Sequence, residues 1–147
     1  MSNTGFDISR IEGEITVSLK AADPYGLVQA SALALGSLLT SNTGPTQVFE
    51  SACLFFAGTS RHELLTRLWV ELLFFLRQEQ LNLVRAVVAE FSDSRLDVEC
   101  HFSPDFTLGT LLLGPEWLAG EIAVPVCTEV NGAWVARVVW KAAGAHA

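Results

Sequence analysis

The segment from Ser60 to Leu76 constrains the fold more than any other part of the sequence. It begins with SRHE, a capping box in which Ser60 and Glu63 each satisfy a free backbone amide at the start of a helix. Behind this box, leucines and Trp69 recur at helical spacing and make a broad apolar face. Such a face must be buried, so the chain needs a further layer of secondary structure to cover it.

Alternating apolar and polar residues predict strands before this helix. In EITVSLK, residues 14 to 20, every second residue is apolar, which is typical of a half-buried strand. Asp23 followed by Pro24 indicates the start of a helix that runs to about Leu39. A second strand, QVFESACLFFAG at residues 47 to 58, then leads into the capped helix.

After Gln80 the hydrophobic period changes to two. LNLVRAVVAEF and LDVECHF flank SDSR and predict a hairpin, and a short strand is expected at 107 to 113. GEIAVPVCTEV and AWVARVVWK predict a closing hairpin over Asn131 and Gly132, a dipeptide that suits a type I′ turn. Pro125 cannot donate to a strand ladder, so its strand is expected at an edge or at a bulge.

The order of these elements predicts the fold class. One strand, a helix, a second strand, a second helix and four or five hairpin-linked strands indicate an α+β fold. We expect two layers, with two helices packed on one face of a mixed, mostly antiparallel sheet. The 147 residues contain no repeat, linker or low-complexity segment, so a single domain over 1–147 is predicted.

Charge and hydropathy exclude several classes of partner. Nine basic against sixteen acidic residues give an acidic chain of net charge −7 without a run of like charges, so direct binding of nucleic acid is not expected. The most apolar region, Leu64 to Leu76, is interrupted by Arg67 and Glu71 and is too short to cross a bilayer. The start of the sequence has no signal-peptide pattern, which favours a cytoplasmic location.

Cysteine spacing and known motifs argue against familiar catalytic centres. Cys53, Cys100 and Cys127 are odd in number and have no CxxC spacing, so we expect buried free thiols instead of disulfides or a zinc site. The sequence has no G-x-S-x-G, P-loop or dinucleotide fingerprint. An enzyme of a hydrolase or nucleotide-binding type is therefore not expected.

Asp97, Glu99 and His101 form a D-x-E-x-H set on one face of a predicted strand. Successive alternate positions lie about 7 Å apart, and three such ligands can begin a metal site when a fourth comes from elsewhere. An enzyme that uses a metal at these residues is one hypothesis. A solvated strand face explains the same pattern, since any sheet with one wet face alternates in this way.

Three stretches together resemble the archease family: GEITVSLKAADPYGLVQASALALGSLLT, HELLTRLWVELLFFLRQEQLNLVRAVVAEF and GAWVARVVWKA. The resemblance rests on the leucine-rich second helix and on the order of elements. Archeases are small acidic cofactor proteins of the RNA ligase that seals tRNA exons and repairs broken RNA, and they promote its guanylylation and turnover. The resemblance therefore implies an archease-like fold and a role in tRNA processing through protein–protein interaction.

The chain departs from the family at its metal site, which consists of a His-Thr-Ala-Asp stretch and an aspartate ending the last strand. RIEGEITV places Glu14 at the first aspartate without a preceding histidine, and Lys141 falls at the terminal aspartate. EIAVPVC stands in place of the family's KAVTYH segment. Our hypothesis is that the metal site is lost and that Lys141 pairs with Glu14 in place of the ion.

Two other interpretations of these positions stay open. Lys141 can simply end a strand and reach solvent, as terminal lysines commonly do. Alternatively, Glu14 still holds a divalent metal such as Ca or Mg. On the hypothesis of a lost site, no cofactor is expected.

Two functions follow from the sequence. The first is an accessory protein that binds and modulates a partner such as the tRNA-splicing and RNA-repair ligase. The alternative is a divergent, non-catalytic protein-binding or dimerisation module that keeps the scaffold without ligase activation. In that case the edge near Pro125 or residues 103 to 118 would form a homodimer or partner surface.

Overall fold

The structure is a computed structural model that describes residues 4–39, 50–79, 81–103 and 115–144. The strands of these residues form two separate sheets. Sheet A has the order β1-β2-β7-β6, from β1 (Gly5–Ile11), β2 (Glu14–Ala21), β7 (Ala133–Lys141) and β6 (Glu121–Val130). Sheet B has the order β3-β5-β4, from β3 (Glu50–Ala57), β5 (Arg95–Ser103) and β4 (Asn82–Phe91).

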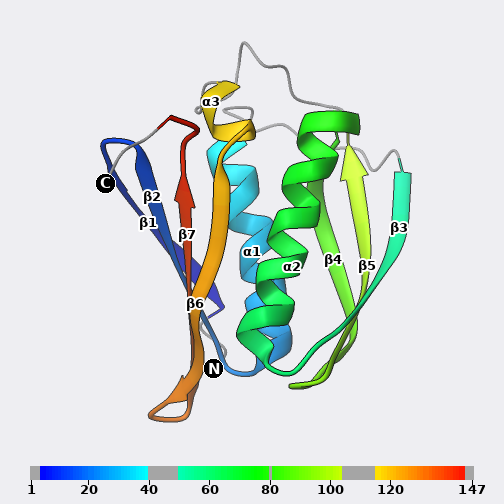
Figure 1. The fold of residues 1–147 in the computed structure, drawn as a ribbon. Helices are drawn as coiled ribbons and strands as arrows, with labels where there is room; N and C mark the ends of the chain where they lie inside the picture. The colour runs from blue at the N-terminus through cyan, green and yellow to red at the C-terminus, as the bar shows by residue number, and fades with distance from the viewer. Residues whose placement is uncertain (1–3, 40–49, 80, 104–114, 145–147) are drawn as a thin grey trace.

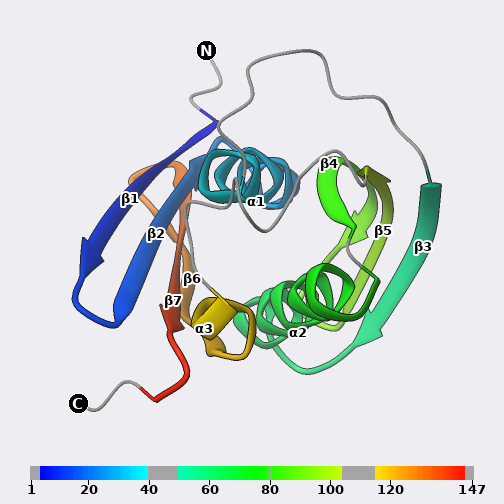
Figure 2. The same ribbon diagram turned by 90° about the horizontal axis from the view of Figure 1, so that it is seen from above.

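Two long helices lie between the sheets (Figure 1). They are α1 (Pro24–Leu39) and α2 (Arg61–Phe74), and α2 continues into a π-helical turn, η1 (Phe75–Glu79). A short helix, α3 (Pro115–Leu118), lies at one end of the molecule. The view from above shows sheet A and sheet B on opposite sides of the helix pair (Figure 2), so each sheet has helices on one face only.

The α+β fold class is confirmed, and in both sheets the helices cover a single face. The strands divide between two antiparallel sheets, where the sequence predicted one mixed sheet. The physical reason lies in the helices, because a helix that is apolar over a broad face needs cover from more than one direction. In α2 that face comprises Leu64, Leu65, Leu68, Trp69, Leu72 and Leu73, all buried.

Both helices begin where the sequence predicted. The Asp23 carboxylate accepts a hydrogen bond from the Gly26 amide at 2.9 Å, which satisfies one of the free amides ahead of α1. At α2 the Ser60 hydroxyl accepts from the Glu63 amide at 3.3 Å, and the Glu63 carboxylate accepts from the Thr59 amide at 2.8 Å. The capping box is confirmed, with Thr59 supplying the second amide.

A buried polar link joins the two helices. The Ser31 hydroxyl on α1 donates to the Leu27 carbonyl at 2.9 Å and accepts from the Trp69 indole nitrogen on α2 at 3.0 Å. Ser31 and Trp69 are both fully buried, and the hydroxyl of one and the indole N–H of the other satisfy each other's need for a hydrogen-bond partner. The link therefore joins α1 to α2 within the core without leaving a buried polar group unpaired.

The C-terminal hairpin has the predicted turn and the predicted irregularity. Asn131 and Gly132 both have positive φ, at 53° and 81°, as a type I′ turn requires. β6 lies at one end of sheet A, and its register with β7 shifts between Ala123 and Val126. Pro125 is therefore both on an edge strand and at a bulge, which confirms the two expectations.

The structure contains one strand that the sequence analysis did not predict. β1, GFDISRI, pairs with β2 along its whole length and forms the other edge of sheet A. The strand expected at 107 to 113 lies outside the described residues. No described helix is long and apolar enough to span a membrane.

Candidate functional site

The end of sheet A brings three charged residues into one row. Glu14 opens β2, Lys141 closes β7, and Glu121 opens β6, and the pairing register sets Lys141 directly opposite both glutamates. Their neighbours Ile15 and Trp140 are fully buried, so the three charged side chains share the face of the sheet that points away from the helices. We call Glu14, Lys141 and Glu121 the charged row.

Local backbone features create this row. Gly13, with φ of 77°, turns the chain between β1 and β2 so that Glu14 becomes the first residue of β2. The bulge at Pro125 shifts the register of β6 by one residue, and without it Glu121 would oppose Ala142. The sequence analysis missed Glu121, although the Asn131-Gly132 turn and a bulge at the proline together lead to it.

The charged row includes Glu14 and Lys141, the two residues for which the sequence predicts an ion pair. Directly opposed residues of neighbouring strands have Cβ atoms about 4.5–5.5 Å apart, which puts both carboxylates within reach of a lysine ammonium. In the part of the chain that the structure describes, no ion pair within 4.0 Å joins Lys141 to either glutamate, and Lys141 is exposed. The structure thus brings Glu14 and Lys141 together in register, and their pairing stays a prediction.

A pocket of about 780 Å³ adjoins the charged row at the turn between β1 and β2. The Arg10 guanidinium lies 5.4 Å from the ring centroid of Trp117, and the exposed carboxylates of Glu12 and Glu116 border the same space. None of these residues was singled out from the sequence. Two acidic side chains and one arginine give this pocket a mixed charge.

The walls of this pocket are held rigidly. The Trp140 indole donates to the Trp117 carbonyl at 2.9 Å, and the two rings pack edge to face with centroids 6.2 Å apart. The amide of Ala142 donates to the Gly13 carbonyl at 3.0 Å, which ties the end of β7 to the first turn. A Cβ atom on Gly120 would overlap the Lys141 carbonyl oxygen, so only glycine allows this approach.

The side chains at the charged row do not fit a divalent metal ion. A metal site needs oxygen or nitrogen donors that converge, whereas here an ammonium stands between the two carboxylates. Over residues 4–39, 50–79, 81–103 and 115–144, no group of three or more His, Cys, Asp or Glu side chains is arranged to hold a metal. The charged row therefore presents two carboxylates with an ammonium between them on the outer face of sheet A.

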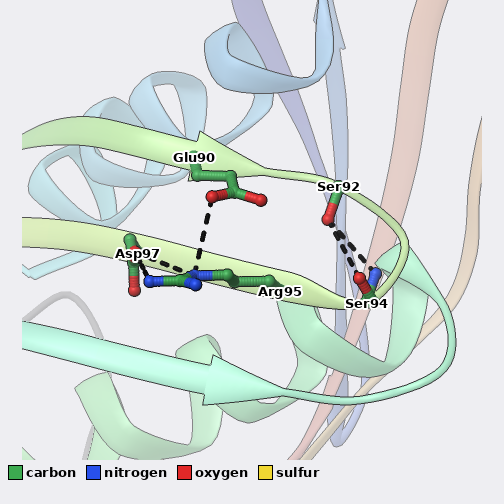
Figure 3. Close-up of polar contacts among 5 residues, drawn as sticks. All are labelled: Glu90, Ser92, Ser94, Arg95 and Asp97. Carbon is green, nitrogen blue, oxygen red and sulfur yellow. Dashed lines mark hydrogen bonds and ion pairs between the residues drawn. The ribbon is translucent and has the colours of Figure 1, made fainter.

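The second polar set from the sequence lies on the outer face of sheet B, where its charges pair among themselves. Asp97 accepts two hydrogen bonds from the Arg95 guanidinium, at 2.8 and 3.0 Å, and Glu90 lies 3.5 Å from the same group (Figure 3). Arg95 also lies 4.9 Å from the Phe55 ring centroid. Asp97 is thus occupied by an arginine, and the hairpin turn beyond it is closed by Ser92 and Ser94 (Figure 3).

Glu99 and His101 have a separate set of contacts. The Glu99 carboxylate lies 3.5 Å from Nε2 of His101, and Nδ1 of the same ring lies 3.3 Å from an Arg85 guanidinium nitrogen. The guanidinium must donate, so Nδ1 accepts and the proton of the neutral ring sits on Nε2, facing Glu99. Arg95 thus binds Asp97, Arg85 contacts His101, and Glu99 lies beside the same imidazole, and this pattern favours the solvated strand face over a metal centre.

The three cysteines are free thiols, but they are not all buried. Cys100 is fully buried, and burial, with a smaller contribution from Cys53, raises the pKa of its thiol to about 12. Burial also raises the pKa of Cys127 to about 11, with Arg61 opposing the shift. Cys53 is exposed on β3, so the expectation of a buried thiol was wrong there, because β3 is an edge strand whose alternate residues face solvent.

Comparison with known proteins supports the fold. No family model and no curated protein matches the sequence. The chain is similar to the solution structure of Methanobacterium thermoautotrophicum protein 1598, a structural genomics target, with a TM-score of 0.65 and 16% sequence identity. The similarity covers 93% of this chain and 98% of that one, so the two share one architecture over nearly their whole length.

Proposed function

We propose that the chain is an archease-like accessory protein that acts by binding a partner, with an RNA ligase of the tRNA-splicing and RNA-repair type as the candidate. The observation that carries the proposal is the charged row. Glu14 and Lys141, which the archease resemblance aligns with metal-binding aspartates, are cross-strand partners in the fold. The lysine supplies at this position the positive charge that an ion supplies in the family.

An accessory protein of this kind works by differential affinity. A partner that exchanges between two conformations shifts toward the one that the accessory protein binds more tightly. The charged row and the Arg10–Trp117 pocket beside it offer both signs of charge, with the Arg10 guanidinium held against the buried Trp117 ring. Such a surface fits a folded partner that presents a complementary pattern of charges.

Purified RNA ligase from the native host provides the test. We expect the chain to bind the ligase and to raise its rate of guanylylation, and we expect Lys141→Gln to weaken binding about tenfold, the loss of one charge-assisted contact. Arg85→Gln is the matched control, because it removes one exposed positive charge from the outer face of sheet B. The absence of any complex, or an equal loss in both variants, would rule out the proposed partner or the proposed surface.

The stand-in role of Lys141 has its own test. We expect Lys141→Asp to gain binding of Ca²⁺ or Mg²⁺, since Glu14, Glu121 and the new carboxylate would then face one another in register. Isothermal titration calorimetry measures the gain directly. If the unaltered chain bound calcium as tightly as the variant does, the proposal that Lys141 takes the place of a metal ion would be contradicted.

A second candidate function is a dimerisation or protein-binding module without ligase activation. The observation that favours it is the edge of sheet B, where β3 has exposed side chains at Cys53 and at Phe55, which is 57% exposed. At the edge of sheet A, Pro125 is exposed, and residues 104–114 of the other expected surface lie outside the described residues. Sedimentation velocity distinguishes the candidates, because a dimer disrupted by Phe55→Glu supports the second.

A further inference from the structure

The basic side chains of this molecule divide sharply by their contacts. Three of the nine Lys and Arg residues, namely Lys20, Arg137 and Lys141, have no hydrogen bond, ion pair or aromatic contact in the part of the chain that the structure describes. All three lie on the outer face of sheet A. The remaining six contact a carbonyl, a carboxylate, an imidazole or an aromatic ring: Arg10, Arg61, Arg67, Arg77, Arg85 and Arg95.

Two of the three, Lys20 and Arg137, line one depression of about 580 Å³ on that face. The pairing register places its outward-facing residues in two neighbouring rows across the sheet. Gly5, Phe6, Leu19 and Ala136 also line it, and its outward-facing side chains are Asp7, Ser18, Lys20, Val126, Val135 and Arg137. We call it the sheet A depression.

Sequence features shape the sheet A depression. The Asn131-Gly132 turn sets the register that places Val126 opposite Arg137, and the bulge at Pro125 interrupts β6 directly beside Val126. Lys20 pairs with Gly5 on one side and with Val135 on the other, and because Gly5 has no side chain the row stays open toward β1. The floor is thus apolar at the two valines and carries a cation on each of two strands.

We infer that the sheet A depression binds a small organic monoanion with an apolar body. Lys20 and Arg137 are diagonal neighbours on adjacent strands, where Cβ atoms lie about 7–8 Å apart, so both long side chains can converge on one anionic group. An anion there relieves the repulsion between two unpartnered cations. The valines accept the apolar body, and the volume falls within the range of small-molecule sites.

Asp7 sets the charge of the ligand. It lies in the row of Ser18 and Arg137, on the β1 side of the depression. Its carboxylate repels a second negative charge, which favours a monoanion over a dianion.

The sheet A depression is separate from the charged row, because Glu14 and Lys20 stand six residues apart along β2, about 20 Å. The inference therefore goes beyond the proposed partner and does not depend on it.

Naphthalene-2-sulfonate is a suitable probe because it joins one negative charge to a rigid apolar body. Methanesulfonate, which lacks the body, and 2-naphthol, which lacks the charge, are its matched controls. Binding is followed by NMR through the valine methyl groups of the full chain, where Val126 and Val135 report on the depression. We expect the sulfonate to shift these methyl signals at lower concentration than either control compound.

Variants then test the two cations. Lys20→Gln and Arg137→Gln are each expected to weaken binding of naphthalene-2-sulfonate about tenfold, the loss of one charge-assisted hydrogen bond. Lys141→Gln removes an equal charge from the same face, about 13 Å from Arg137 along β7 and about 20 Å from Lys20, beyond the screening length of about 10 Å, so its effect should stay within about twofold.

Four results with the probe, its controls and the variants would overturn the inference. They are an equal loss in the Lys141→Gln variant, binding of 2-naphthol as tight as that of the sulfonate, binding of methanesulfonate as tight as that of the sulfonate, and no shift of Val126 or Val135 by the probe. Shifts of these methyl groups that depend on protein concentration without any probe would also overturn it, because a second copy of the chain would then occupy the depression.

Discussion

The outer faces of the two sheets carry similar numbers of charged side chains, but these are arranged in opposite ways. On sheet B, Arg95 binds Asp97 and Glu90, and Arg85 with Glu99 flanks His101, so the charges satisfy one another. On sheet A, Lys141 stands between two glutamates without a close contact in the described residues. The comparison teaches that polar alternation alone does not distinguish a face whose charges pair with one another from a face whose charges lie in register without pairing.

The difference lies in the contacts that the side chains make. On sheet B, Arg95 lies two residues from Asp97 on the same face of β5, and Asp97 is directly opposite Glu90, so one guanidinium contacts both carboxylates. Short distances let these side chains pair, although each exposed pair contributes only about 0.2–1 kcal/mol. On sheet A, Lys141 is directly opposite Glu14 and Glu121 at the end of the strands, yet no ion pair within 4.0 Å joins them in the described residues.

The largest expected effect is a loss of stability when a side chain is truncated between the two sheets, and it tests whether the sheets share one core. Leu68 on α2 is fully buried between them, and Leu68→Ala should lower the free energy of unfolding by about 2–5 kcal/mol. Urea unfolding measures this loss, with tryptophan fluorescence and the NMR signals of Val98 in sheet B as two probes. We expect both signals to disappear in one transition. Val70→Ala, on the exposed side of α2, should stay within about 0.5 kcal/mol. Two separate transitions would show that the sheets have independent cores.

The two faces of sheet B should differ strongly in thiol chemistry. Iodoacetamide at pH 8 is expected to label Cys53 and to leave Cys100 unmodified, because Cys100 is buried and its thiol pKa is raised to about 12. Mass spectrometry of the labelled peptides measures this. Labelling of Cys100 at the rate of Cys53 in the folded protein would mean that sheet B opens readily.

The same pKa shift predicts how stability depends on pH. The folded chain keeps the Cys100 proton above pH 9, the ordinary thiol value, where the unfolded chain loses it. The contribution of the Cys100 thiol to the free energy of unfolding is therefore fully present below pH 9, and it declines as the pH rises from 9 toward about 12. Urea unfolding at increasing pH measures the decline, and Cys100→Val should reduce it. An unchanged decline in that variant would assign the effect to other groups.

The smallest expected effect is the change in the free energy of unfolding when one cation is removed from the outer face of each sheet. Arg95→Met removes the contacts with Asp97 and Glu90 from half-exposed side chains, so we expect a loss of about 1 kcal/mol in the free energy of unfolding. Lys141→Met removes no close contact within the described part of the chain and should change it by less than about 0.5 kcal/mol. Equal losses measured by urea unfolding would contradict the contrast between the two sheets.

Much of the fold followed from sequence because local signals and burial agreed. The capping box, the Asn131-Gly132 turn and the irregularity at Pro125 each depend on residues with specific backbone chemistry, and the structure has all three. β1 was missed because it is an edge strand with only one paired neighbour, so most of its residues are exposed and its apolar alternation is weak. The division into two sheets depends on long-range packing, which no local pattern encodes.

The candidate site followed from sequence only in part. Glu14 and Lys141 were linked by the archease resemblance, and the register shows them as cross-strand partners. Glu121 depends on the exact shift produced by the bulge, and the pocket at Arg10 and Trp117 depends on how α3 packs against the end of sheet A. Neither feature can be read from residue spacing.

The most direct test of the account is an NMR titration of the valine-labelled chain with the host's RNA ligase. Val139 lies on the outer face of sheet A next to the charged row, and Val87 lies on the outer face of sheet B. The account predicts that the ligase shifts or broadens the Val139 methyl signals and leaves those of Val87 unchanged. Changes at Val87 alone, or no change at either valine, would contradict it.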